Sequence, residues 1–157
     1  MFVVADTTPL NYLILIEQIE LLPELYERVV IPHAVLVELH HAGTPSPVRA
    51  WASNLPSWCE VREPTSTPDA ILNLLDAGER DAIQLALDMG FNTLLMDEMK
   101  GRREAQRRSL KVVGTLAILE EGAQSGWIDF RTCLNRLEGA GFRLSGHLRT
   151  QFLMRNP

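Results

Sequence analysis

Short apolar runs alternate along the chain with longer stretches in which apolar residues recur at helical spacing. A run of about four apolar residues suits a strand, and recurrence every three or four residues suits a helix that buries one face. Two of the runs, 2–5 and 93–96, are continuously apolar, as expected of strands covered on both faces. The pattern predicts five strands: Phe2–Ala5, Val29–Ile31, Cys59–Arg62, Thr93–Met96 and Lys111–Val113.

Helical segments are expected between these strands and after the last one. Thr8 followed by Pro9 predicts a capping hydroxyl before a proline at the first helical position, and Gly90 predicts a helix end. The expected helices are Pro9–Ile16, Pro32–His41, Pro47–Asn54, Asp69–Leu75, Glu79–Met89, Lys100–Ser109, Leu116–Ser125, Arg131–Ala140 and His147–Met154.

This alternation of strands and helices predicts an α/β fold with a mainly parallel central sheet flanked by helices. We expect a single domain over residues 1–157, in which the part from about residue 116 forms a helical C-terminal extension. No internal repeat and no linker-like tract divides the chain.

Composition supports one folded domain and excludes several other classes of protein. The 157 residues are 46% hydrophobic and 22% charged, which is enough for one core and is not typical of disorder. No apolar run approaches the roughly 18 residues of a membrane span. The N-terminus lacks the basic segment of a signal peptide, so a cytoplasmic location is expected. Cys59 and Cys133 are far apart, which argues against zinc.

Charge is unevenly divided along the chain. Residues 1–100 carry 15 acidic and 5 basic residues, a net −10, whereas residues 101–157 carry 5 acidic and 10 basic residues, a net +5, which together give −5. Such a surface could hold a metal ion at one end and phosphates at the other. Solvated basic faces on the later helices explain the division equally well.

Four carboxylates occupy positions where the pattern would place an apolar residue or leave a strand end bare. Asp6 and Asp97 each follow a buried-type strand, Glu38 interrupts an apolar helical segment, and Glu79 begins another. Ligands of open parallel sheets bind beyond the carboxyl ends of the strands. Taken singly, each acid has a structural explanation as a helix cap, a first-turn acid or an exposed helical residue.

Taken together, the four acids come from separate segments that end or begin at the same kind of topological position. Carboxylates without a histidine partner suit Mg²⁺ or Mn²⁺ better than zinc. Such a site can activate water and neutralise charge during displacement at a phosphodiester. We therefore expect Asp6, Glu38, Glu79 and Asp97 to form a divalent-cation site.

A basic cluster lies on the helix expected just after Asp97. It contains Lys100, Arg102, Arg103 and Arg107, several of which share one helical face. Their place beside Asp97 favours contact with nucleic-acid phosphates. The alternative is a solvated face, or pairing with nearby acids.

Three segments together resemble the motifs of one known family. They are ADTTPLNYL at 5–13, IPHAVLVELHHAG at 31–43 and LDAGERDAIQLALDMGFNTLLMDEMKGRREAQRRSLKVVGTLAIL at 75–119. In this order and spacing they resemble the PIN-domain nucleases, most closely a PIN-like branch related to VapC-type toxins. The resemblance covers about residues 1–120 and continues through GFRLS at 141–145.

The resemblance implies metal-dependent cleavage of RNA by attack of water on a phosphodiester. It implies that the four acids are the catalytic residues and the ligands of Mg²⁺ or Mn²⁺. It also implies a hydroxyl on Thr8, or on Thr7, that orients a carboxylate or a water molecule. Asp81 competes with Glu79 as the third acid, and Glu98 is placed to share the metal.

The same resemblance implies partners. Relatives of the VapC type are toxins of toxin–antitoxin pairs, which predicts an RNA substrate and an antitoxin protein as partners. Such proteins commonly form homodimers, and the apolar residues of Leu10–Leu25 are a candidate dimer surface.

Two other functions remain open at this point. One is a PIN-like regulatory or interaction module that binds metal, RNA or protein with little cleavage. The other is a haloacid-dehalogenase-like phosphatase, which also uses an Asp after a strand. That chemistry needs a second acid two residues later, where this chain has Thr8.

Overall fold

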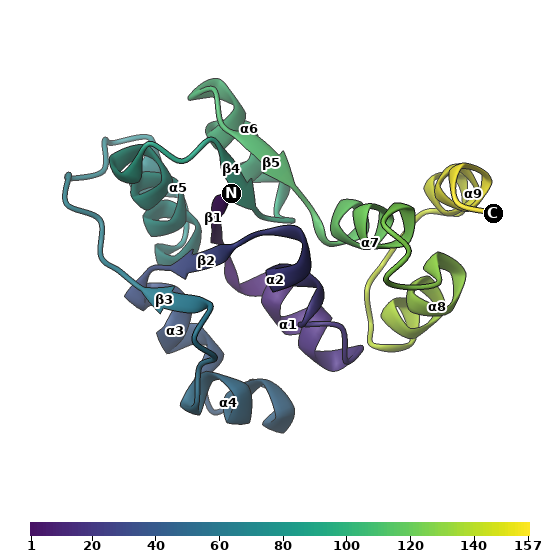
Figure 1. Ribbon diagram of the computed structural model, residues 1–157. Coiled ribbons are helices and arrows are strands. Elements are labelled where there is room, and N and C mark those ends of the chain that lie inside the picture. The colour runs from purple at the N-terminus through teal and green to yellow at the C-terminus, as the bar shows by residue number, and fades with distance from the viewer.

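A five-stranded parallel sheet forms the centre of the computed structural model, which describes residues 1–157 (Figure 1). The strand order is β3-β2-β1-β4-β5, and every neighbouring pair is parallel. This confirms the predicted single-domain α/β class. The strands are β1 (Phe2–Ala5), β2 (Arg28–Ile31), β3 (Cys59–Val61), β4 (Thr93–Leu95) and β5 (Lys111–Val113).

Helices connect the strands and follow the last of them. Their bounds are α1 (Thr7–Leu15), α2 (Leu21–Leu25), α3 (His33–Leu39), α4 (Ser46–Ser53), α5 (Ala77–Met89), α6 (Met99–Arg107), α7 (Thr115–Gln124), α8 (Phe130–Gly139) and α9 (Gly146–Arg155), with a short 3-10 helix η1 (Leu72–Leu74). Gly90 ends α5 in the left-handed conformation, with φ of 68°, as the sequence predicts.

Successive strand residues point to opposite faces of the sheet and feed two apolar cores. Val3 and Val29 face the larger core, which is completed by side chains of α1, α2, α3, α4, α7 and α8. Val4 and Leu94 face the smaller core, which is completed by η1, α5 and α6. Both faces of the sheet are therefore covered, which explains why β1 is apolar throughout and β4 carries one polar residue, the buried Thr93.

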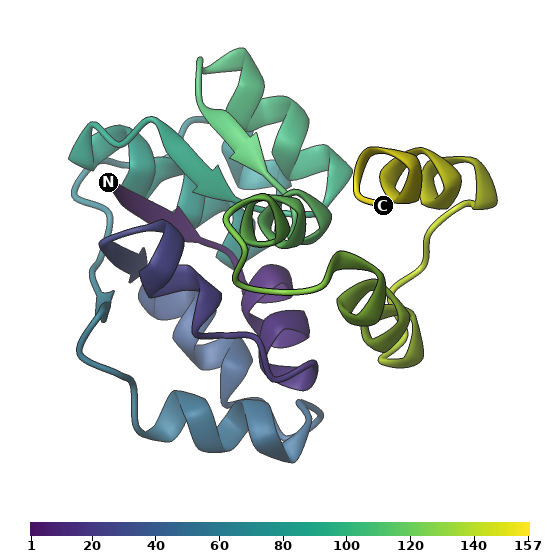
Figure 2. The same ribbon diagram turned by 45° about the vertical axis from the view of Figure 1, so that its right-hand side comes forward.

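The last two helices lie to one side of the sheet, next to α7 (Figures 1 and 2). Helix α8 buries Phe130 and Leu134, whereas α9 has no buried residue. Helix α9 is held by stacking of Phe152 on Phe130, with ring centroids 6.1 Å apart, and by an Arg155–Glu120 ion pair at 3.0 Å. It thus packs on the domain through few side chains.

Two helix predictions are wrong. The helix expected at Asp69–Leu75 is reduced to the three residues of η1, because the Asp69 side chain accepts a hydrogen bond from the Leu72 amide at 2.9 Å and Leu75 is extended. Helix α2 was not predicted, since its five residues are too few to show a helical period.

The start of α1 also differs from the prediction. Asp6 occupies the N-cap position and the helix begins at Thr7, so Thr8 is not the cap and Pro9 is the third helical residue. Proline is tolerated there because the first amide groups of a helix have no partner within it.

Only part of the Leu10–Leu25 segment is accessible for the dimer surface predicted there, which stays a prediction. Leu10, Leu13 and Leu22 are fully buried in the larger core. No helix of the protein is long and apolar enough to cross a membrane.

Candidate active site

Asp6 and Asp97 meet at the carboxyl edge of the sheet because β1 and β4 are neighbours. Asp6 directly follows β1, and its amide donates to the Leu95 carbonyl at 2.9 Å. Met96, which precedes Asp97, donates its amide to the Val113 carbonyl at 3.0 Å. These bonds continue the sheet pattern beyond the strands and fix the backbone of both acids.

Glu38 and Glu79 come from helices that pack against each other over this edge, α3 and α5. The contact is close at Gly78, where an added Cβ would lie 2.5 Å from Glu38 Oε1 and 3.2 Å from Asp6 Oδ1. Glycine is thus required for Glu38 and Asp6 to lie against the first turn of α5. The next residue in that turn is Glu79, which is 7% exposed.

Two threonines orient two of the acids. The Thr7 hydroxyl donates to Glu38 Oε2. Thr115 donates its amide to Asp97 Oδ1 at 2.9 Å and its hydroxyl to Asp97 Oδ2 at 2.6 Å. Thr8 forms no hydrogen bond with any of the four acids, so the predicted hydroxyl contact lies on Thr7 instead.

Burial, together with repulsion by neighbouring acids, raises the pKa values of the Asp6, Glu79 and Asp97 carboxyl groups. Burial raises the pKa of Asp6 from 3.8 to about 7, and the nearby charges of Glu38, Asp76 and Asp97 add to the shift. Burial, followed by the charges of Asp76 and Asp6, raises the pKa of Glu79 from 4.5 to about 8. Burial also raises the pKa of Asp97, against the opposing hydrogen bonds from Thr115.

None of the four acids takes part in an ion pair. Arg102 lowers the pKa of Asp97 through its charge but is not in salt-bridge contact with it. The site therefore concentrates negative charge that Arg102 offsets only in part and without a direct ion pair, and the remaining charge is costly unless it is neutralised.

Asp76 is a fifth acid at this edge that the sequence analysis missed. It caps α5 by accepting a hydrogen bond from the Glu79 amide at 2.9 Å, and its charge raises the pKa of both Asp6 and Glu79. The available signal was the spacing of Asp76 and Glu79, which has the form of a capping box.

The other predicted acids divide between the site and its surroundings. Asp81 forms an ion pair with Arg80 at 2.9 Å. Its charge is not among those that raise the pKa of Glu79. Glu98 occupies the N-cap position of α6, and its charge raises the pKa of Glu79 and of Asp97. Glu98 thus lies at the edge of the acidic group.

The residues suit a hard divalent cation by donor type. As the side chains are arranged, no three of the His, Cys, Asp and Glu residues form a group that could hold a metal ion by themselves. Mg²⁺ commonly takes only one or two carboxylates directly and keeps several waters. The buried Asp6 carboxylate has no ion-pair partner and lies with the Glu38 carboxylate against Gly78, which fits an ion held in this way.

The predicted phosphate-binding cluster of α6 is split between two faces. Arg102 reaches the acidic edge, where its Nη1 donates to the Met96 carbonyl at 3.3 Å. Lys100, Arg103 and Arg107 instead line a separate hollow together with Leu74. Arg107 is also paired with Glu104 at 2.9 Å. Only Arg102 of this cluster lies beside the acids.

Two cavities flank the acids at opposite ends of the sheet edge. Thr7, Glu38 and His41 line one of about 430 Å³, and Asp97 and Arg102 line another of about 400 Å³. Given the strand order, Glu38 lies on the β2 side of Asp6 and Asp97 on the β4 side. Asp6 and Glu79 line neither hollow, and we call the stretch of sheet edge between the two hollows the cleft.

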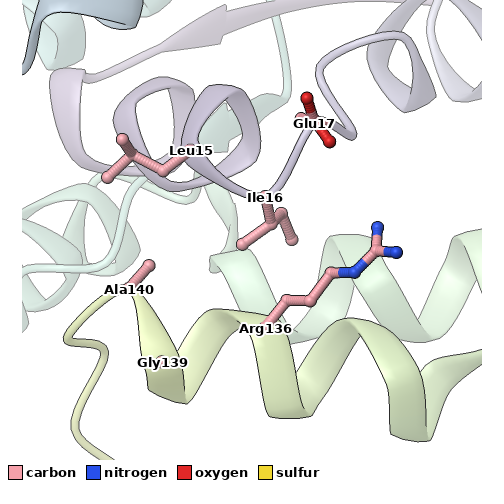
Figure 3. A pocket seen from close by; sticks show the side chains of 6 residues that line it. All are labelled: Leu15, Ile16, Glu17, Arg136, Gly139 and Ala140. Carbon is pink, nitrogen blue, oxygen red and sulfur yellow. The ribbon is translucent and has the colours of Figure 1, made fainter.

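A further cavity, of about 430 Å³, lies away from the acids (Figure 3). It separates the end of α1, at Leu15, Ile16 and Glu17, from the end of α8. None of the four acids lines it, and we assign it no part in the site.

A protein-family model described as a PIN domain matches residues 2–156. The match includes the three C-terminal helices as well as the sheet. No curated protein matches the chain.

Proposed function

The chain belongs to the PIN-domain family, a family of nucleases, and on this premise we propose that it hydrolyses RNA phosphodiester bonds with the help of a divalent metal ion. The observation that carries the proposal is the convergence of Asp6 and Glu38 on Gly78, beside Glu79 and next to Asp97 at the sheet edge. A group of acids that is buried at Asp6 and Glu79 and forms no ion pair is suited to a cationic cofactor and an anionic substrate.

Asp6, Glu38, Glu79 and Asp97 are the residues that would hold Mg²⁺ or Mn²⁺. Such an ion, when bound, supplies an activated water and balances the charge of the phosphate. Thr7 and Thr115 hold the carboxylates of Glu38 and Asp97 in fixed orientations. Holding these groups in place before the substrate arrives lowers the cost of reorganisation during the reaction.

Arg102 contributes positive charge on the Asp97 side of the cleft. It forms no ion pair and so remains available to a phosphate oxygen. We assign it the role of positioning the RNA backbone across the acids.

A toxin role extends this proposal. It would require an antitoxin protein that blocks the cleft, and a homodimer would bring two clefts together. Both ideas rest on the resemblance to VapC-type toxins. Growth arrest on induced expression, relieved by Asp6→Asn, would support the toxin role, whereas undisturbed growth would argue against it.

A regulatory or interaction module is the second candidate. It is favoured by one observation, that no three acidic, histidine or cysteine side chains form a metal-holding group as they stand. A module of this kind would bind RNA or a protein partner without cutting it.

Cleavage of a pool of structured and single-stranded RNAs separates the two candidates. Wild-type protein is compared in Mg²⁺, Mn²⁺ and EDTA with Asp6→Asn and with Asp129→Asn, a control whose carboxylate caps α8 far from the cleft. We expect RNA fragments that form only with metal present, and that form with wild type and Asp129→Asn but not with Asp6→Asn. Equal RNA profiles for all three proteins in every metal would overturn the nuclease proposal and favour the module.

A further inference from the structure

The cavity on the Asp97 side of the cleft is built differently from the acidic edge that it adjoins. Asp97 and Arg102 form the end next to the acids, and the remaining walls come from α7, α9 and the segment between α8 and α9. The lining is mainly apolar and includes Leu116, Phe142, Leu144, Leu148 and Phe152, and Arg143 is a second basic residue in it.

The aromatic walls are fixed by contacts behind them. Phe142 packs edge-on against Tyr12, with ring centroids 5.1 Å apart, and Phe152 stacks on Phe130 at 6.1 Å. Leu148 is 44% exposed, so this part of the wall is open to solvent. A volume of about 400 Å³ lies within the usual range of small-ligand sites, roughly 300 to 1,000 Å³.

Charge at the cavity indicates the kind of occupant. Neither Arg102 nor Arg143 is engaged in an ion pair, so both are free to meet an anion. An apolar hollow with two free arginines, joined directly to a carboxylate site, complements a nucleotide, whose base is flat and apolar on its faces and whose phosphates are anionic.

Resting on the nuclease function proposed above, we propose that this cavity binds one unpaired nucleobase next to the phosphate held at the acids. Arg102 and Arg143 contact the phosphates on either side of that nucleotide. The base must leave its stack to enter, so the substrate is single-stranded RNA or the loop of a folded RNA, and a continuous duplex is excluded.

Binding of short RNAs tests this assignment without depending on cleavage. Asp6→Asn protein in Mg²⁺ is titrated with a fluorescent 12-nucleotide single-stranded RNA, with the same strand in a duplex, and with an abasic strand that keeps the ribose-phosphate backbone. We expect the intact single strand to bind about tenfold more tightly than either of the others, as expected for one stacked base. Equal affinity for the intact and abasic strands would overturn the assignment.

Two variants of α9 locate the effect in the cavity. Leu148→Glu, made in the Asp6→Asn protein, places a carboxylate in the apolar wall, and Met154→Glu makes the same change at a residue of α9 that is 77% exposed and lies outside the cavity. Leu148→Glu should abolish the preference for bases, and Met154→Glu should keep it. Circular dichroism melting checks that both variants fold, and Ala117→Phe, which fills the cavity without adding charge, provides a second blocked variant.

The outcomes separate this inference from the proposed function. The wild-type protein could cut no RNA while the binding still depends on the base and is lost in Leu148→Glu and Ala117→Phe. This outcome would support the nucleobase site and reject the nuclease function. If the wild type cuts RNA but binding does not depend on the base, the nuclease function is supported and the nucleobase site is rejected. The nucleobase site is also rejected if Leu148→Glu and Ala117→Phe bind RNA as tightly as Met154→Glu does, and a protein partner would then be the better candidate for this surface.

Discussion

Thr115 donates its backbone amide and its hydroxyl to the two carboxylate oxygens of Asp97, at 2.9 and 2.6 Å. Thr115 is the first residue of α7 and directly follows Gly114, which follows β5. An acid that ends β4 therefore caps a helix that begins after β5. This pair of bonds fixes the Asp97 carboxylate and closes the sheet edge on that side.

Removing the hydroxyl should weaken both activity and stability. Thr115→Val removes the hydroxyl of a fully buried residue and leaves the half-buried Asp97 Oδ2 without that donor, so we expect a loss of about 1 to 2 kcal/mol in the free energy of unfolding. RNA cleavage should fall roughly tenfold, because a misoriented carboxylate holds the reacting groups less well. Urea unfolding and initial cleavage rates measure the two effects. Thr115→Ser keeps the hydroxyl and should recover most of both, and a Ser variant as weak as Val would contradict this role.

Adding a Cβ at residue 78 should lower activity while changing stability little. The Cβ of Gly78→Ala would meet Glu38 Oε1 at 2.5 Å and push this side chain from its place beside Asp6. Alanine also favours a helix over glycine by up to about 1 kcal/mol, so stability should change little. We expect the rate of RNA cleavage to fall at least tenfold, because Glu38 is no longer held beside Asp6. Gly139→Ala, where nothing lies within 4 Å, is the matched control. Full activity in Gly78→Ala would show that the convergence is irrelevant.

The raised pKa of Asp6 predicts a stability that declines with pH when no metal is present. The folded pKa of about 7 lies above the ordinary value of 3.8, so the folded state holds a proton that the unfolded state has released. This stabilisation is complete below the unfolded pKa and is lost as pH rises through the folded one. Between pH 5 and pH 8 the wild type should lose roughly 2 to 3 kcal/mol through Asp6.

Asp6→Asn removes this dependence. Urea unfolding in EDTA at pH 5 and pH 8 should show a smaller decline for the variant than for the wild type, so that the variant gains relative stability at pH 8. Glu79, with a pKa raised to about 8, leaves some decline in both proteins. Parallel declines in the two proteins would mean that Asp6 is not the titrating group.

Divalent metal should reverse the loss at high pH. A ligand that binds only the folded state stabilises it by about 2.7 kcal/mol when present at 100 times its dissociation constant. Thermal melts of wild type at pH 8 should therefore shift upward as Mn²⁺ is added after removal of EDTA, and those of Asp6→Asn should shift far less. A Tm that Mn²⁺ leaves unchanged in the wild type would count against a metal site.

Arginines of α6 should differ in their effect on RNA. Arg102→Gln removes a charge beside Asp97 and should raise KM several-fold, with a shallower dependence of binding on salt. Arg107→Gln alters a side chain that is 69% exposed and paired with Glu104, and should change KM less than twofold. Cleavage kinetics at two salt concentrations compare them. Equal losses in the two variants would show that the whole basic helix binds RNA.

The strands and the positions of Asp6 and Asp97 could be predicted because a strand covered on both faces is a continuous apolar run, and a charge at its end stands out. The roles of Asp76 and Thr115 could not. Each is an ordinary turn or cap residue in sequence, and its contact with an acid depends on which strands are neighbours. The cavity walls at Phe142 and Leu148 depend on how α9 packs against the domain. The spacing of apolar residues within α9 does not predict that packing.

The basic cluster illustrates a different limit. Helical spacing correctly groups Lys100, Arg103 and Arg107 on one face and leaves Arg102 off it. Spacing does not say which of the two faces meets the sheet edge. The assignment required the orientation of α6, which is set by Gly101 and Ala105 packing against the smaller core.

The strand order also determines how late during synthesis of the chain the acidic site can be completed. β1 is made first but lies at the centre of the sheet, and its second neighbour, β4, is made about 90 residues later. Asp6 and Glu38 can meet early, whereas Asp97 and its partner Thr115 arrive only after both remaining strands have been synthesised. The group of four acids, with Asp97 held by Thr115, can therefore be complete only after β4 and β5 have joined the sheet, so chain segments that are far apart in the order of synthesis build one site.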